Sequence, residues 1–224
     1  MESNKNPVTA WMEADTAVPP DFPFVIRPMR DWHLAAVMEI ERQAFPSPWP
    51  ESAYRYELRY GSESGFYVLQ PAGQSTPQAD GWLGRLLGGQ RQNEAPVLGY
   101  WGVRFRAHNA HLSTIAVHPH WRGQGLGEYL LLTSLHWASR RGAQEMTLEV
   151  RASNRVAQYL YIKTGFVRTG MRPGYYSDGE DAWLMALRLD PAHIASLWIQ
   201  MQAVKERLLR IRFADPMSKQ EVSK

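Results

Sequence analysis

The sequence predicts an α/β fold of the layered α+β kind, built around one central sheet. Short apolar runs of strand length alternate along the chain with longer segments whose apolar residues recur at helical spacing. Strands and helices that interleave in this way usually form a single sheet with helices packed on it. The chain has 224 residues, of which 44% are hydrophobic and 21% charged, so it is long enough to bury a substantial core.

The first half of the domain is predicted to contain three strands and two helices. FVIRPMR (24–30) has the composition of a strand, and Asp31 suits the N-cap of a helix that runs to Phe45. The prolines of PSPWP (46–50) end that helix, and a second helix follows them. Two further strands are predicted at 65–70 and 97–105.

The second half continues the alternation. HLSTIAV (111–117) is a strand that leads through a glycine-rich loop into a helix near 128–141, which Gly142 ends. A helix over 153–166 has Ser153 as its candidate cap and Gly165 as its stop. The remaining predicted strands are 145–150, 166–172 and 182–189.

Four segments fall outside this predicted domain of residues 23–190. We expect a flexible N-terminal tail over 1–22 and a second tail over 214–224. Residues 71–96 separate neighbouring strands, and 12 of these 26 residues are Gly, Pro or Gln, which indicates a flexible insertion. Residues 191–213 carry an apolar stripe at helical spacing. Docking of that helix on the domain is favoured over a membrane-surface or partner-binding role.

Composition excludes several classes of protein. The chain has no cysteine, so it has no disulfide framework and no thiolate nucleophile. It lacks a signal-peptide pattern and an apolar run of membrane-spanning length, and its net charge of +3 is too small to indicate direct nucleic-acid binding. We therefore expect a cytoplasmic protein. Four histidines (His108, His111, His118 and His120) have no familiar metal-ligand spacing, so no metal site is predicted.

The sequence RGQGLG (122–127) places three glycines between a predicted strand and a predicted helix. The N-terminus of a helix offers unpaired N–H groups and a partial positive charge, which suit a phosphate. Glycines leave no side chain between the backbone and a ligand, and Arg122 adds a full charge. The pattern is neither a P-loop nor a dinucleotide-binding fingerprint. By itself it is equally consistent with a flexible turn before a core helix.

Several further motifs occur in the order found in one family. LEVRASN (148–154), LYIKTGF (160–166), YYSDGEDA (175–182) and AFPSPW (44–49) accompany the glycine loop. Together they resemble the GNAT acyltransferases, and within them the RimI-type protein N-terminal alanine acetyltransferases. The resemblance extends from about Phe24 to Leu189. It implies a mixed sheet with helices on both faces and with two central strands splayed apart.

The resemblance implies a site for acetyl-CoA, with coenzyme A as a product. The loop residues Arg122, Gly123, Gln124, Gly125, Leu126 and Gly127 are expected to bind the pyrophosphate. The backbone of Ile115, Ala116 and Val117 is expected to bind the pantetheine arm like an added strand. Asn154 matches a cofactor-binding asparagine of the family, although its position is also typical of an ordinary helix cap.

The resemblance also assigns the chemistry. Glu149 matches the general base, and its pKa would be raised in a cleft; the alternation of EMTLEV alone favours a solvent-facing carboxylate. Tyr161 matches the proton donor to the departing thiolate, and its alternative is a packing role. Tyr175, Tyr176 and Trp49 are expected to line the site for the peptide N-terminus, and a simple aromatic cover is the alternative.

The predicted function is acetyl transfer from acetyl-CoA to the N-terminal α-amine of a protein, possible acceptors including a ribosomal protein. Because there is no cysteine and no triad-like pattern, direct attack by the amine is simpler than an acyl-enzyme. The alternatives are acetylation of a small amine or lysine side chain, and a non-catalytic module that only binds acetyl-CoA. Retention of both Glu149 and Tyr161 disfavours the last of these.

Overall fold

The computed structural model describes residues 21–72 and 95–211, and these form a seven-stranded mixed sheet. The strand order is β1-β2-β3-β4-β5-β7-β6, and only β4 and β5 run parallel to each other. The strands are β1 (Phe24–Pro28), β2 (Ser64–Pro71), β3 (Gly99–Arg106), β4 (Asn109–Val117), β5 (Glu145–Arg151), β6 (Val167–Arg172) and β7 (Ala182–Arg188).

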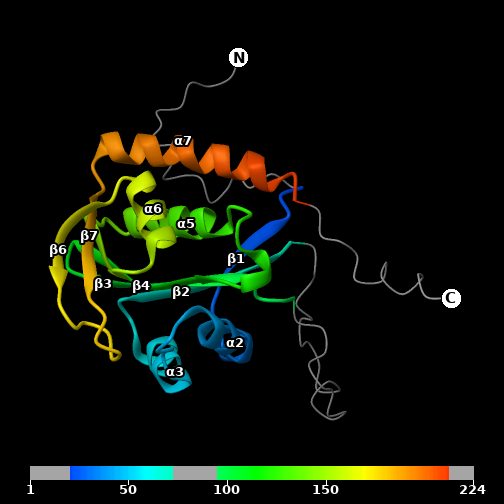
Figure 1. The fold of residues 1–224 in the computed structure, drawn as a ribbon. Coiled ribbons are helices and arrows are strands. Elements are labelled where there is room, and N and C mark those ends of the chain that lie inside the picture. The colour runs from blue at the N-terminus through cyan, green and yellow to red at the C-terminus, as the bar shows by residue number, and fades with distance from the viewer. Residues whose placement is uncertain (1–20, 73–94, 212–224) are drawn as a thin grey trace, which may run out of the picture.

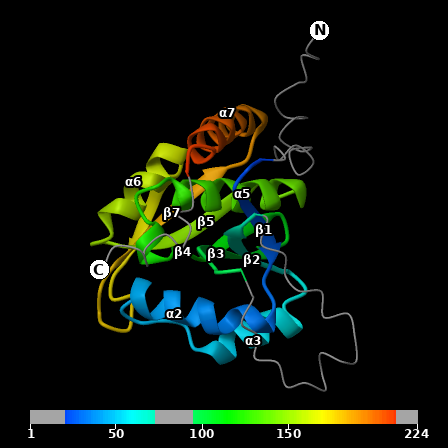
Figure 2. The same ribbon diagram turned by 90° about the vertical axis from the view of Figure 1, so that its right-hand side faces the viewer.

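Helices cover both faces of the sheet, as the resemblance implies (Figure 1). The helical elements are η2 (Asp31–His33), α2 (Leu34–Ala44), α3 (Glu51–Tyr60), η3 (Pro119–Trp121), α5 (Leu126–Arg140), α6 (Arg155–Thr164) and α7 (Pro191–Leu208). α2 and α3 lie on one face, and α5 and α6 lie on the other (Figures 1 and 2). A separate buried apolar cluster fills the space beneath each pair of helices.

β4 and β5 separate soon after they begin to pair. Their parallel register runs only from Asn109↔Glu145 to His111↔Thr147, although β4 continues to Val117 and β5 to Arg151. Beyond that point, the backbone edge of β4 that faces β5 pairs with no strand within residues 21–72 and 95–211. The predicted splay between the central strands is therefore confirmed, and it begins just after His111.

β4 also carries a bulge at this position. Gly102 of β3 pairs with Thr114 and Val103 pairs with Leu112, so that Ser113 is the extra residue. A bulge bends its strand and increases the local twist. The bend helps to move the end of β4 away from β5 and so opens the gap.

Most predicted elements occur within a few residues of their expected bounds, but some details were wrong. The helix over 31–45 is divided into the short η2 and then α2, so Asp31 does not cap one continuous helix. α6 is capped by Asn154 and not by Ser153. Phe22, assigned to the N-terminal tail, is buried and packs against Phe24 and Tyr129.

The predicted insertion is ordered at both described ends. Pro71 belongs to β2, and Ala95 is buried and accepts a hydrogen bond from the Gln70 side chain. Residues 73–94 lie outside the described residues, as do the tails 1–20 and 214–224 and the last predicted helical residues 212–213.

The C-terminal helix docks on the domain, as its apolar stripe favours. α7 lies on the outer side of α5 and α6, away from the sheet (Figure 2). Its buried apolar residues are Ile194, Leu197, Met201, Val204 and Leu208, and all belong to the core cluster on the α5 side. None of the helices within 21–72 and 95–211 has the length and apolar character needed to cross a membrane.

Candidate active site

The glycine loop has a backbone that only glycine adopts readily. Gly123 and Gly125 have φ angles of 76° and 92°, in the left-handed region. Gly125 is the N-cap of α5, so the first N–H groups of that helix point out of this loop without partners inside the helix. A Cβ placed on Gly123 would meet no atom within 4 Å, so the loop presents open backbone on that side.

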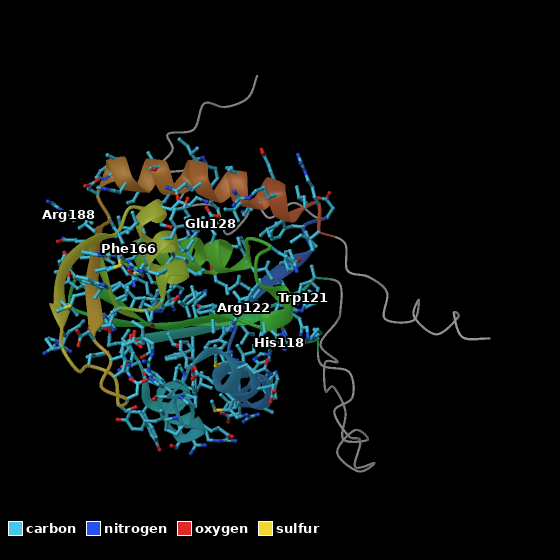
Figure 3. All side chains as sticks on the ribbon, viewed as in Figure 1. His118, Trp121, Arg122, Glu128, Phe166 and Arg188 are labelled. Atoms are coloured by element: carbon cyan, nitrogen blue, oxygen red, sulfur yellow. The ribbon has the colours of Figure 1, made fainter. Side chains whose placement is uncertain are left out.

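The other loop residues contribute in different ways. Arg122 is exposed, and its Nε donates to the Val117 carbonyl at 3.1 Å, which ties the loop to the end of β4. Figure 3 shows Arg122 and Trp121 beside this loop. Gln124 is exposed, whereas the side chain of Leu126 is in the core. Leu126 can therefore offer a ligand only its backbone.

The strand edge next to the loop is also accessible for hydrogen bonding. Ile115, Ala116 and Val117 pair with β3 on one side, at Trp101, Tyr100 and Gly99. On their other side lies the gap that the splay opens. The end of β4 and the start of α5 thus offer a continuous series of backbone groups.

Asn154 lies at the start of α6. Its Oδ1 accepts a hydrogen bond from the Ala157 N–H at 3.1 Å, which is the N-cap interaction. The capping alternative is therefore present in the structure. The cofactor role remains a prediction, for which the Asn154 amide nitrogen is the donor.

Glu149 is held by His111, for which the sequence favours a solvated or core histidine over a metal ligand and predicts no role in the site. His111 Nε2 lies 3.2 Å from Glu149 Oε2, and His111 Nδ1 lies 3.0 Å from the Thr147 hydroxyl. Because an ionised carboxylate can only accept hydrogen bonds, His111 Nε2 is the donor to Glu149, and the Thr147 hydroxyl is within hydrogen-bonding distance of Nδ1. This chain of three side chains stands at the last β4–β5 pair, where the splay begins.

The pKa of Glu149 is lowered from its ordinary value of 4.5, and the expectation of a raised pKa was wrong. The hydrogen bond from His111 is the largest cause, and the charges of His111 and Arg172 act in the same direction. Burial acts against them but is smaller. The Glu149 side chain is 19% exposed. The carboxylate is thus ionised at neutral pH.

Tyr161 is buried on the opposite face of the sheet. Its ring lies in the core cluster beneath α5 and packs against Phe166 at 5.7 Å between ring centroids. Met146, Leu148 and Val150 of β5 face the same cluster, so Glu149 points to the other face. Burial, with a smaller contribution from Tyr176, raises the pKa of Tyr161 well above its usual range. Tyr161 therefore keeps its proton at neutral pH.

Tyr175 and Tyr176 lie in the loop between β6 and β7, with their ring centroids 5.0 Å apart. Burial is the largest cause that raises the pKa of each hydroxyl, that of Tyr176 to about 12, and the Glu149 charge contributes to both. The guanidinium of Arg151 lies over the Tyr176 ring at 3.9 Å. The two tyrosines are thus close enough to Glu149 to share its electrostatic environment.

Trp49 is part of the turn between α2 and α3, and its ring packs on Tyr54 and beneath Arg104. Its backbone N–H donates to Glu41 Oε2 at 2.9 Å. Glu41 is fully buried and also accepts from the Tyr54 and Tyr100 hydroxyls. This carboxylate fixes the turn, and no motif in the sequence indicated that role.

The turn and the β6–β7 loop meet across the site. The Ser47 and Ser177 hydroxyls lie 2.7 Å apart, so the two segments expected to line the acceptor site are joined by a hydrogen bond. The two predicted groups of acceptor residues therefore come from adjacent walls.

The backbone groups of the glycine loop and of β4 fit acetyl-CoA, the acyl donor that the family resemblance implies. Exposed backbone at the glycine loop suits a pyrophosphate, and the free edge of β4 suits a chain of amides. The hydroxyl oxygen of Ser113, in the bulge, is buried and is among the few side-chain atoms of the described ranges without a hydrogen-bond partner. Ser113 is the extra residue of the bulge, next to the point where β4 and β5 separate.

Within the described ranges, no group of three or more His, Asp or Glu residues could hold a metal ion. His118 stacks on His120 at 5.1 Å, and Figure 3 shows His118 beyond Arg122, near the end of the sheet.

Comparison with known proteins identifies the class. The model of the Acetyltransferase (GNAT) family matches residues 34–166, more than half of the chain. The chain therefore belongs to the GNAT acetyltransferases, a family that uses acetyl-CoA. The fold, with its splayed strands and glycine loop, is the GNAT fold that the motifs implied.

Particular relatives are named as N-terminal acetyltransferases. A putative ribosomal protein bS18-alanine N-acetyltransferase of Bacillus subtilis is 32% identical over 161 residues, 71% of this chain and 92% of its own. The N-alpha-acetyltransferase RimI of Mycobacterium tuberculosis is 35% identical over 150 residues, 66% of this chain and 81% of its own. The crystal structure of the ribosomal-protein-S18-alanine N-acetyltransferase from Escherichia coli superposes with a TM-score of 0.58 at 29% identity, and the match covers 75% of this chain and 94% of that one.

Proposed function

We propose that this enzyme transfers an acetyl group from acetyl-CoA to the N-terminal α-amine of a protein, with a ribosomal protein of the bS18 kind as its acceptor class. The observation that carries the proposal is the Thr147–His111–Glu149 chain at the start of the splay. It provides an oriented, ionised carboxylate at a gap that connects the two faces of the sheet. The names of the relatives supply the acceptor class.

Glu149 is the group that receives the proton of the attacking amine, directly or through one water. His111 orients the carboxylate by donating from Nε2, and Thr147 fixes the ring from the other side. A carboxylate with a lowered pKa is a weak base. Its main effect is therefore to stabilise the positive charge that develops on the amine as it attacks.

Tyr161 is the proton donor on the other face. Acetyl-CoA, when bound, supplies an activated thioester whose thiolate leaves after transfer. Residues Arg122–Gly127, the backbone of Ile115–Val117 and Asn154 would hold it. The Tyr161 hydroxyl, which keeps its proton until the thiolate leaves because burial raises its pKa, gives that proton to the departing sulfur. Before the next turnover, Glu149 releases the amine's proton to water and the Tyr161 phenolate takes one up.

The acceptor residue at the N-terminus would lie between the α2–α3 turn and the β6–β7 loop. The Ser47–Ser177 hydrogen bond joins these walls, and Tyr175 and Tyr176 stand next to Glu149. Trp49 belongs to the α2–α3 turn and anchors it by packing its ring on Tyr54.

The experiment is mass spectrometry of synthetic peptides after incubation with acetyl-CoA. One series varies the first residue and begins with alanine; a control peptide has a blocked N-terminus and an internal lysine; spermidine is a third acceptor. We expect one acetyl group on the free N-terminus of the alanine peptide only. Acetylation of the lysine or spermidine alone would overturn the proposal in favour of another acceptor. Coenzyme A binding without turnover on any acceptor would overturn it in favour of a non-catalytic module.

A further inference from the structure

The C-terminal helix reaches the glycine loop. A Cβ placed on Gly125 would lie 3.7 Å from Leu208 Cδ2, and Leu208, in the last turn of α7, is completely buried. α7 runs along α5, and its C-terminal end lies on the side of the molecule where Figure 3 shows Trp121 and Arg122. The matched family region ends at residue 166, so α7 lies beyond it.

A second contact is electrostatic and involves Glu128, in the first turn of α5. Only 10% of its side chain is exposed. Glu128 Oε1 lies 2.8 Å from Lys163 Nζ, and Oε2 lies 2.7 Å from an Arg207 guanidinium nitrogen. Lys163 belongs to α6 and Arg207 to α7, so three helices meet at one carboxylate (Figure 3 labels Glu128 beneath α7).

The position of Glu128 makes its pairing important for an anion that binds at the loop. A carboxylate in the first turn interacts favourably with the same N–H groups and helix dipole that would attract a phosphate. Without counter-charges it would also repel that phosphate. The two cations change the charge of the cluster from −1 to +1.

We propose that α7 is a positioning element of the coenzyme A site. It acts through Arg207, which offsets the charge of Glu128, and through Leu208, which supports Gly125 in its left-handed conformation. Arg207 is a positioning residue and not a catalytic one. The inference rests on the proposed role of the glycine loop in binding the phosphates of coenzyme A.

The test measures coenzyme A binding by isothermal titration calorimetry, independently of turnover. In Arg207→Ala, Glu128 keeps only one of its two cations, and we expect the Kd for coenzyme A to rise by roughly 3- to 30-fold. The KM for the peptide acceptor should not change. Arg207→Lys should recover most of the affinity, since it restores the charge.

The double variant Glu128→Gln/Arg207→Ala separates an electrostatic role from a structural one. If Arg207 acts by offsetting Glu128, removing both charges returns the Kd to within about 2-fold of the wild type. Arg188→Ala is the matched control, because Arg188 is exposed and Figure 3 shows it at the opposite side of the molecule. It should leave the Kd unchanged.

Each outcome separates the inference from the proposed function. If the wild type does not bind coenzyme A, the proposed function fails and the inference fails with it. If the wild type binds and Arg207→Ala binds equally well, only the inference is overturned. If the double variant binds coenzyme A as weakly as folded Arg207→Ala does, the inference is also overturned. If Arg207→Ala does not fold, Glu128→Gln provides the test. The inference then requires a lower Kd for coenzyme A with a steeper salt dependence, and a higher Kd contradicts it.

Discussion

At the residue scale, the central feature is a carboxylate whose pKa is set by a histidine. The hydrogen bond from His111 outweighs burial and keeps the pKa of Glu149 below 4.5. The lowered pKa moves protonation of Glu149 to more acidic pH, so it does not cause a loss of activity near neutral pH. An acidic limb near neutral pH must come from the amine of the acceptor, whose ordinary pKa is about 7.7–8.0.

Glu149→Gln should lower kcat by roughly 10²–10⁴-fold, because the amide can neither take a proton nor carry the charge. Coenzyme A affinity should stay within about 2-fold of the wild type, since Glu149 belongs to β5 and not to the glycine loop. Steady-state kinetics with calorimetry checks both values. Glu145→Gln, on the same face of β5, is the matched control and should leave kcat unchanged. Wild-type turnover in folded Glu149→Gln would remove Glu149 from the mechanism.

Tyr161→Phe removes one hydroxyl and leaves the ring in the core. If Tyr161 protonates the thiolate, kcat should fall by roughly 10–10³-fold with little change in cofactor affinity. Because the pKa of Tyr161 is well above 10, the wild type should show no alkaline limb from this group below that pH. A packing role predicts instead a nearly silent substitution. Thermal unfolding of the same protein checks that the core is intact.

The site residues that could be predicted from the sequence are those that belong to recognisable sequence motifs. LEVRASN and LYIKTGF located Glu149 and Tyr161, and the structure puts them on opposite faces of the splayed sheet. His111 and Glu41 were missed as partners because their contacts are made across strands and across elements distant in sequence. The pKa of Glu149 could not be predicted for the same reason: it depends on a side chain of a neighbouring strand.

At the element scale, the β6–β7 loop is tied to β5 by charged groups. Arg151 donates to Asp178 and to Glu180, and Glu180 Oε1 accepts from the Ser153 N–H at 2.7 Å. These bonds hold the loop that carries Tyr175 and Tyr176 above the end of β5.

The tether should depend on pH through Glu180. The hydrogen bonds from Ser153 and then from Arg151 lower its pKa to about 2. A depressed carboxyl pKa gives stability that is complete above the ordinary value of 4.5 and is lost as the pH falls toward 2. Glu180→Gln should therefore reproduce at neutral pH the loosening that the wild type shows only in acid.

Hydrogen exchange at the Ser153 amide is the measurement for this tether. We expect faster exchange in Glu180→Gln at pH 7, together with a raised KM for the peptide. Asp178→Asn is the comparison variant, since Asp178 contacts Arg151 and the Glu180 N–H but not the Ser153 N–H. Unchanged exchange at Ser153 in Glu180→Gln would show that other contacts hold the loop.

The elements themselves were largely predictable because their signals are local. Apolar periodicity located the helices and strands, and glycines marked the ends of α5 and α6, where Gly142 and Gly165 have positive φ angles. The bulge at Ser113 and the division of the first helix were not predictable. Both arise from pairing and packing with distant parts of the chain.

At the scale of the whole molecule, the splay of β4 and β5 opens the sheet between its two faces. Glu149 and His111 lie on the face of the sheet that α2 and α3 cover, and Tyr161 lies on the face that α5 and α6 cover. α7 adds a further layer on the α5 side only (Figure 2). In the proposed function, the acceptor uses the first face and acetyl-CoA uses the second. Changes made on one face should therefore alter one substrate and leave the other.

Deletion of residues 74–94 tests the arrangement of the domain as a whole. β2 and β3 are antiparallel neighbours, and the Leu98 N–H donates to the Leu69 carbonyl at 2.8 Å, so a short turn can join their ends as a hairpin. Loop length changes closure entropy only slowly. We expect the melting temperature to change by less than about 4 °C and the Kd for coenzyme A to stay within about 2-fold of the wild type. Calorimetry measures both, and the KM for the alanine peptide, measured in parallel, reports on binding of the acceptor. A changed peptide KM with unchanged cofactor affinity would assign the segment to the acceptor side, whereas a fall in melting temperature of more than about 10 °C would show that the domain needs this segment to fold.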